Sequence, residues 1–182
     1  MGVTMTTLET LLNDPDLAGV WNLVRDRSAI TFKIRNMWGL VNVKGRFTEF
    51  TGDGQLTGAG AVFGRLDIRA ASLNTGIGRR DKHLRSADFF DVERFGEISV
   101  VVTAIHPTQG KAADLRANLT IKGITAPLPL PVTISEVDDG SIRISGQTKV
   151  DRSQFDLGWN RAGMMAPMAT IAAEAVFVRA PL

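Results

Sequence analysis

The segment LRANLTIK, residues 115–122, alternates apolar and polar side chains at every step. Leu115 and Ile121 belong to the apolar set, whereas Arg116 and Lys122 belong to the polar set. Because successive side chains of a β-strand point to opposite faces, this period of two indicates an antiparallel strand with one dry and one wet face. The segment therefore predicts a sheet whose apolar face must be covered.

The same alternation recurs along most of the chain after Val20. Further alternating runs occupy residues 30–35, 41–48, 64–71 and 142–145. Turn signals rich in Gly and Asp separate them, and Asp139-Gly140 is a strong hairpin signal. A meander of such strands buries its apolar face by closing, and roughly eight strands leave an interior that side chains fill or that holds one ligand. We therefore predict an all-β fold, an extended antiparallel eight-stranded barrel.

Three prolines in the segment APLPLPV, residues 126–132, stand two positions apart: Pro127, Pro129 and Pro131. Residues two apart aim their backbone amides at the same side of a strand, and proline has no amide hydrogen to donate. This segment is therefore predicted to be an edge or a poorly paired stretch.

The composition excludes several classes of function. The chain has 182 residues, which fits one domain, and 21 Lys+Arg against 19 Asp+Glu give a net charge of +2. So small an imbalance gives no indication of a nucleic-acid partner. With no cysteine and two histidines, neither a metal site nor a bound cofactor is expected. No apolar run approaches the roughly 18–20 residues of a membrane span.

The first 18 residues differ from the rest of the chain. Leu8, Leu11 and Leu12 form a stripe at helical spacing, and Pro15 ends the predicted short helix. We expect a helical extension over residues 1–18 that covers a barrel end, followed by the barrel domain over residues 19–182. The extension has neither the basic start nor the apolar core of a secretory signal, so a cytoplasmic location is expected.

The segment RRDKHLRSADFFDVERF, residues 79–95, contains the densest set of titratable groups in the chain. Asp81 and Arg85 stand at the i,i+4 spacing of a helical ion pair, with His83 and Asp88 nearby. We interpret these four side chains as structural. The alternative is a hydrolase or isomerase that uses His83 with Asp81 or Asp88, although a catalytic site requires a more complete constellation.

The apolar half of the same segment suggests where it sits. We predict a short helical insert over about residues 77–91 that crosses the barrel. Leu84, Phe89 and Phe90 would face the apolar interior, and the charged side chains would hold the insert in place. The two phenylalanines, rather than the histidine, would then be the functional half of the segment.

Several segments together resemble the YceI-like family. They include VWNLVRDRSAITFKIRN, VKGRFTEFTGDGQL, ASLNTGIGRRDKHLRSADFFDVERFGEI, ANLTIKGITAPLPLPV and VDRSQFDLGW. The family is known for an extended lipocalin-like β-barrel that binds polyisoprenoid lipids and has no established enzymatic role. The resemblance implies that this chain binds an isoprenoid or another long-chain lipid for carriage, storage or sequestration, and that it forms a homodimer.

We predict the site from the apolar side chains expected to face the lumen or its rim. The predicted ligand contacts are Phe32, Ile34, Trp38, Leu84, Phe89, Phe90, Phe155, Trp159, Met164 and Met165. A polar head group would lie at the mouth, within reach of Arg79, Arg80 or Arg152. Small inward residues such as Gly64, Gly146 and Ala173 leave volume for a ligand, unless larger partners fill it. A filled lumen would instead indicate a non-enzymatic stress or interaction protein.

Overall fold

The computed structural model of the chain describes residues 7–181, most of which lie in β-strands. The strands are β1 (Gly19–Leu23), β2 (Ala29–Asn36), β3 (Val41–Phe47), β4 (Phe50–Leu56), β5 (Val62–Arg69), β6 (Leu73–Asn74), β7 (Glu97–Pro107), β8 (Ala112–Ile121), β9 (Ile124–Glu136), β10 (Ile142–Asp151) and β11 (Met168–Arg179). The α-helices are α1 (Thr7–Leu12) and α2 (Gly78–Arg85), and short 3-10 turns are η1 (Pro15–Leu17), η2 (Arg25–Arg27), η3 (Met37–Gly39), η4 (Ala70–Ser72) and η5 (Arg152–Phe155).

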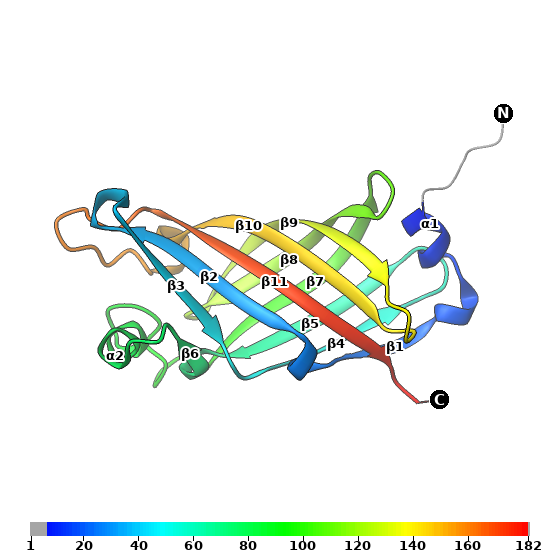
Figure 1. Cartoon of the computed structure of the whole chain (residues 1–182), viewed down its shortest axis with the longest axis horizontal. Helices are drawn as coiled ribbons and strands as arrows, with labels where there is room; N and C mark the ends of the chain where they lie inside the picture. The colour runs from blue at the N-terminus through cyan, green and yellow to red at the C-terminus, as the bar shows by residue number, and fades with distance from the viewer. Residues whose placement is uncertain (1–6, 182) are drawn as a thin grey trace.

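Eight strands close into an antiparallel barrel (Figure 1). The ring runs β1-β4-β5-β7-β8-β9-β10-β11, and β1 pairs with β11 to close it. The strands β2, β3 and β6 extend the wall toward one end, where β2 pairs with β11, β3 with β2, and β6 with β3. The predicted eight-stranded antiparallel barrel, with a short N-terminal helix and a short helical insert, is confirmed.

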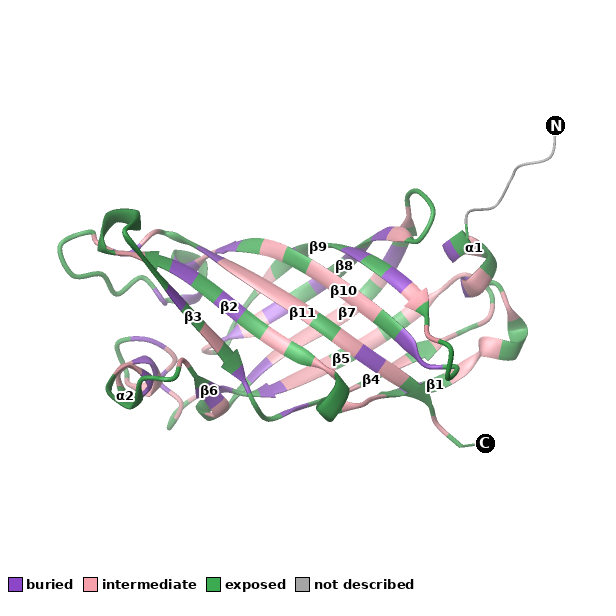
Figure 2. Ribbon diagram, viewed as in Figure 1, coloured by how far each residue is buried: buried purple, intermediate pink, exposed green. Residues whose placement is uncertain are grey.

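The alternation seen in the sequence sets the two faces of the wall (Figure 2). In β8, Leu115 and Leu119 are buried, whereas Arg116 and Asn118 between them are exposed. The inward side chains form two apolar clusters, one toward each end of the barrel. The cluster toward α2 includes Phe47.

Helix α1 covers one end of the barrel, as its leucine stripe predicts. Leu8 and Leu12 are buried against Trp21 and the inward side chains of β7 to β10, and Leu11 is half-buried. The Leu8 amide donates to the Gly110 carbonyl at 3.1 Å. The first six residues of the predicted extension lie outside the described part of the chain.

The three prolines of β9 leave part of the barrel wall unpaired, as predicted. Strand β9 pairs with β8 along its whole proline segment, but its pairing with β10 starts only at Val132. Residues 147–151 of β10 therefore have no β9 partner, and η5 lies beside this stretch of β9. The missing donors of Pro127, Pro129 and Pro131 account for the gap.

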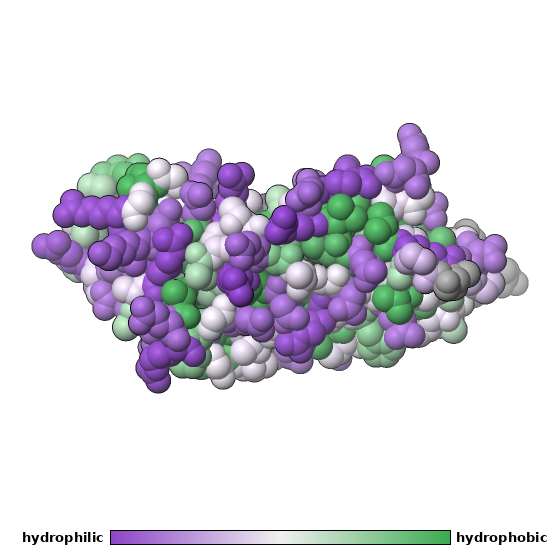
Figure 3. Space-filling view, turned by 90° about the horizontal axis from the view of Figure 1, so that it is seen from below, coloured by the Kyte–Doolittle hydropathy of each residue, from purple (hydrophilic) through white to green (hydrophobic). Residues whose placement is uncertain are grey.

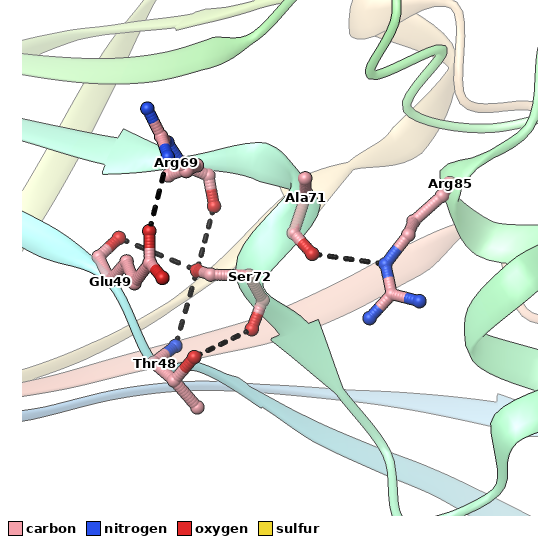
Figure 4. A network of polar contacts seen from close by, with 6 residues as sticks. All are labelled: Thr48, Glu49, Arg69, Ala71, Ser72 and Arg85. Carbon is pink, nitrogen blue, oxygen red and sulfur yellow. Dashed lines mark hydrogen bonds and ion pairs between the residues drawn. The ribbon is translucent and has the colours of Figure 1, made fainter.

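A polar network joins the bend between β3 and β4 to η4 (Figure 4). Thr48 donates from its backbone amide to the Ser72 carbonyl at 3.2 Å, and Arg69 and Glu49 form an ion pair at 3.4 Å. Arg85 of α2 donates from Nε to a carbonyl of η4 at 2.9 Å. The helical insert is thereby bonded to η4, which precedes it in the chain.

Candidate functional site

Two adjacent apolar chambers lie along the barrel interior. The chamber toward α1 has a volume of about 150 Å³ and the chamber toward α2 about 140 Å³. We call these the α1 chamber and the α2 chamber. The residues that line both form a waist: Ile30, Leu66, Val100, Leu130, Gly146 and Ala173. An apolar cavity of about 150 Å³ stays dry and is large enough to bind benzene, so each chamber can take a comparable apolar group.

Half of the predicted ligand contacts line the α2 chamber. They are Phe32, Ile34, Leu84, Phe89 and Phe90. The Phe32 ring lies so close to Gly45 that a Cβ there would overlap it, and its centroid is 5.5 Å from that of Phe47. Phe47 in turn packs edge-on against Phe90, with centroids 6.0 Å apart. The insert therefore brings its aromatic side chains onto the aromatic wall of β2 and β3.

Four other predicted contacts lie outside the cavity lining. Phe155 and Met165 are buried in the apolar cluster toward α2. Met164 is half-buried, and Trp159 is partly exposed beside α2. These side chains come from η5 and the loop of residues 157–167, so they support the α2 chamber from behind instead of lining it.

The structure corrects the predicted position of Trp38 in the lumen. It lies in η3, the turn between β2 and β3, where its side chain is 69% exposed and does not line the cavity. The strand alternation that places Phe32 and Ile34 inside ends at Asn36. Met37 and Trp38 then adopt left-handed backbone angles (φ 50° and 53°), which turn Trp38 away from the barrel.

The predicted ion pair between Asp81 and Arg85 is also wrong. Asp81 is buried, and its Oδ1 accepts from the Thr75 amide at 2.9 Å and the Thr75 hydroxyl at 2.5 Å. Arg85 donates to the carbonyls of Ala71 and Leu73 at 2.9 Å and 2.7 Å. Both side chains hold α2 to the segment before it, so the tertiary bonds replace the local pair.

His83 and Asp88 do pair, with 2.9 Å between Nε2 and Oδ2. The His83 ring also packs edge-on against Phe89 at 5.1 Å and against Trp159 at 4.6 Å between centroids. Phe89 and Trp159 are themselves 5.3 Å apart. This aromatic trio (His83, Phe89 and Trp159) joins α2 to the 157–167 loop, and neither His83 nor Asp88 lines the cavity.

Arg152 is the predicted head-group residue that lines the α2 chamber. It is 4% exposed and forms no ion pair with any described residue. Its Nε donates to the Ala166 carbonyl at 2.9 Å, and its Nη1 donates to the carbonyls of Leu157 at 2.5 Å and Trp159 at 3.4 Å. Burial lowers the pKa of Arg152, against the opposing effect of Asp151. An arginine nevertheless stays protonated in a protein, so a positive charge lies at the chamber wall.

The other two predicted head-group residues do not reach the cavity. Arg80 donates from Nε to the Thr75 hydroxyl at 2.9 Å and from Nη2 to the Thr75 carbonyl at 3.1 Å. Arg79 is exposed on the first turn of α2. Neither side chain lines a chamber.

The sequence did not identify most of the residues that line the two chambers as ligand contacts. The α1 chamber is lined by Trp21, Leu23, Leu56, Val62, Val102, Ile134, Ile142 and Phe177, among others. These residues carried a signal, because most lie on the apolar side of an alternating run. The small residues Gly64, Gly146 and Ala173, which were expected to leave volume, do line the cavity.

Sequence comparison identifies the barrel. A profile of the YceI-like domain matches residues 21–177, which span the whole ring of strands. The chain belongs to the YceI-like family. A UPF0312 protein of Pseudomonas putida strain W619 is 31% identical to this YceI-like chain over 143 residues, which cover 78% of this chain and 73% of the relative. A UPF0312 protein of Shewanella baltica is 30% identical over 64% of this chain and 63% of its own length.

Solved structures share the fold of this YceI-like barrel. BcnA of Burkholderia cenocepacia superposes with a TM-score of 0.79 at 23% identity, covering 85% of this chain and 98% of BcnA. A polyisoprenoid binding domain from Saccharophagus degradans gives a TM-score of 0.73 at 17% identity, covering 88% of this chain and 98% of that domain. A mutant YceI protein of Campylobacter jejuni, crystallised with a monobromobimane guest, gives 0.68 at 22% identity and covers 79% of this chain and 88% of that protein.

Within residues 7–181, no helix is long and apolar enough to cross a membrane. No group of three or more His, Asp or Glu side chains in the same range is placed to hold a metal ion.

Proposed function

We propose that this YceI-like barrel binds one long-chain lipid in its lumen, an isoprenoid or another fatty-chain amphiphile. The observation that carries the proposal is the two-chambered apolar cavity, whose chambers meet at a waist lined partly by Gly146 and Ala173. An extended chain lying through the waist would contact both chambers. The polyisoprenoid-binding description of the Saccharophagus degradans neighbour supports the same ligand class.

The free energy of binding would come mainly from the tail. Burial contributes about 0.8 kcal/mol per CH₂, so a five-carbon isoprene unit contributes on the order of 3–4 kcal/mol before the costs of ordering the ligand. Affinity should therefore rise with chain length until both chambers are filled. Carriage, storage and sequestration all require this kind of binding.

We place the polar head group beside Arg152. This guanidinium is the charged group that faces the α2 chamber, and Nη2 has no described hydrogen-bond partner. A phosphate, carboxylate or carbonyl oxygen in the chamber would accept from it. The tail would then run past the waist toward the α1 chamber.

We propose binding in preference to catalysis, because of where the histidine lies. His83 is bonded to Asp88 and packed between Phe89 and Trp159, outside the cavity lining. That position suits a residue that fixes the insert. The homodimer implied by the family resemblance stays a prediction.

The first test is to identify what the purified protein carries. Native mass spectrometry and solvent extraction should reveal a long-chain lipid, and stripped protein should take up isoprenoid alcohols with affinity that increases with chain length. A barrel that is reproducibly empty and fails to take up any of these alcohols would contradict the proposal.

The second test narrows the waist. Ala173 lies inside the wall, opposite Gly146 on β10 and Ile30 on β2, so Ala173→Phe would block the passage between the chambers. We expect this variant to lose affinity for long chains by tenfold or more while it keeps short ones. Ala29→Phe adds the same ring on the exposed outer face of β2 and is the matched control. Equal long-chain affinity in both variants would show that the tail does not pass the waist.

A further inference from the structure

The turn between β2 and β3 exposes a dense set of large apolar side chains. Met37, Trp38, Leu40 and Val41 are 47%, 69%, 83% and 41% exposed. Figure 3 shows hydrophobic side chains gathered at the end of the molecule where this turn lies. We call these four residues the apolar tip. Four such side chains within five positions differ from the single exposed hydrophobic residues that are normal on a protein surface.

The backbone holds the apolar tip in an unfavourable conformation. Met37, Trp38 and Gly39 all have positive φ angles, of 50°, 53° and 91°. Left-handed angles are strained for the first two residues and persist only where the surroundings enforce them. The Trp38 amide donates to the Met164 carbonyl at 3.0 Å, and the Met37 amide donates to the Asn36 side chain at 2.8 Å. The turn is therefore fixed by its backbone bonds, although its apolar side chains bury little surface within the chain.

The outer face of the same hairpin is basic. Lys33 and Arg35 on β2, and Lys44 and Arg46 on β3, are exposed, and Lys33 lies directly opposite Lys44. Like charges placed opposite each other destabilise a strand pair. None of the four forms an ion pair with any described residue. We call them the basic face.

We propose that the apolar tip and the basic face dock the protein on an anionic lipid bilayer. Apolar and aromatic side chains bordered by lysine and arginine are suited to insertion at a membrane–water interface, where tryptophan is enriched. Anionic head groups would supply the counter-charges that the basic face lacks in the chain, with each cation raising binding roughly fivefold. A second copy of this chain does not match this surface equally well, because contact between two such hairpins would oppose two basic faces.

Docking would also place the α2 end of the barrel at the lipid. The apolar tip, the 157–167 loop and α2 lie at the same end of the molecule (Figure 1). The α2 chamber lies toward that end, where Phe89 and Phe90 line it. If the lumen binds a lipid, as proposed above, docking would shorten the path by which the lipid enters from the bilayer. The docking itself does not depend on what the lumen holds.

The test is flotation of the purified full chain with two kinds of vesicle. One contains phosphatidylcholine alone, and the other adds phosphatidylglycerol. We expect flotation with the anionic vesicles, and its loss at high salt because salt screens exposed charges. Equal flotation with both vesicles, or none with either, would overturn the proposal.

Matched variants separate the two parts of the surface from general effects. Trp38→Ser with Leu40→Ser, and Lys33→Glu with Lys44→Glu, should each reduce anionic-vesicle binding tenfold or more. The control for the tip is Val20→Ser, which removes an exposed apolar side chain of β1 that does not line the cavity. The control for charge is Arg116→Glu with Arg143→Glu, which makes the same change in net charge on the outer faces of β8 and β10. Equal losses in variants and controls would contradict docking through this hairpin.

Two readouts keep this proposal distinct from the others. If sedimentation velocity shows a dimer that the Trp38→Ser, Leu40→Ser variant loses, that result would assign the tip to a second copy and overturn docking. The same variant should still bind an isoprenoid alcohol supplied without vesicles, because its altered residues do not line the cavity. Flotation without any lumen binding would contradict the proposed function and leave docking standing.

Discussion

Arg152 places a positive charge in an otherwise apolar chamber wall. Burying a charge without a carboxylate partner is unfavourable, and here three backbone carbonyls of residues 157–166 offset part of that cost. The same guanidinium therefore has two roles to separate, one in holding the loop and one in receiving a head group. Lysine cannot reproduce the planar fork of donors, whereas methionine removes the charge.

We predict that Arg152→Met loses preference for an anionic head group. The native protein should prefer a long-chain phosphate over the alcohol of the same chain. In the variant this preference should be smaller by about 2 kcal/mol, since hydrogen bonds to charged groups contribute about that much. Arg152→Lys should keep part of the preference while lowering the melting temperature. Ligand displacement measures the first effect and thermal unfolding the second. An unchanged preference in the methionine variant would place the head group elsewhere.

At single positions, the sequence predicted what depends on strand alternation and missed what depends on turns. Phe32 and Ile34 were assigned correctly to the inner face because a period of two is a local property of the chain. Trp38 failed because left-handed backbone angles end the alternation. The predicted Asp81–Arg85 pair does not form because the Asp81 carboxylate accepts hydrogen bonds from Thr75, six positions before it. Helical spacing carries no information about such a partner.

The insert depends on the aromatic trio for its attachment to the 157–167 loop. We predict that His83→Ala lowers the free energy of unfolding by about 1–3 kcal/mol, because it removes two edge-on ring contacts and the bond to Asp88. Chemical denaturation measures this loss. His106, exposed on β7, provides the matched control. If His106→Ala costs as much, the trio is not what holds the insert.

The turn η5 links stability to pH through its capping residue. Asp151 accepts from the Ser153 hydroxyl at 2.7 Å and the Ser153 amide at 2.9 Å, and these bonds lower the pKa of Asp151. A carboxyl whose pKa is lower in the folded state stabilises the protein above its unfolded pKa, near 3.9, and this contribution is lost as pH falls through the folded value.

We therefore predict that Asp151→Asn weakens the loss of stability in acid. Melting temperatures measured from neutral pH to below about pH 4 should fall less steeply for the variant than for the native protein. At neutral pH the variant should melt only slightly lower, because asparagine also caps helical turns. Identical pH profiles for the two proteins would show that this carboxyl does not contribute.

At the scale of elements, strands and the insert were predictable, and the small turns were not. The proline triplet indicated the unpaired stretch of β9 because an absent donor is visible in the sequence. The bends that divide three long strands, at η2, at Thr48–Glu49 and at η4, arise where the wall curves from one end to the other. That curvature depends on partners distant in the chain, such as the Ser72 carbonyl that receives the Thr48 amide.

In the whole molecule, α1 covers one end of the barrel, and the proposed docking surface lies at the other end. We predict that Leu8→Ala releases α1 from the covered end, because truncating a buried leucine costs about 2–5 kcal/mol and an isolated six-residue helix is not stable. Hydrogen exchange at the amides of Leu8 and Gly60, which bond across this end, should speed up tenfold or more. Leu11→Ala, at a half-buried position, should have a smaller effect. Unchanged exchange in the Leu8 variant would show that α1 is held by other contacts.

The overall barrel was predictable because every strand repeats the same two-residue period, and closure follows from the need to bury one face. The size of the cavity was not predictable, because it depends on which side chains face each other across the lumen. Ala173 lies opposite Gly146 only after β10 and β11 have paired in register. Whether small residues leave a space or receive a larger partner is a property of the assembled wall.

The unpaired stretch beside Pro127, Pro129 and Pro131 gives the barrel wall a place where it can widen. Along most of the ring, widening the lumen would break the hydrogen bonds of a ladder, but residues 124–131 of β9 have no ladder with β10 to break. Beside this stretch, the wall of the α2 chamber is held by packing against η5, which is softer than a ladder. If the lumen binds a lipid as proposed, ligands that differ in thickness would fit there without unfolding a strand.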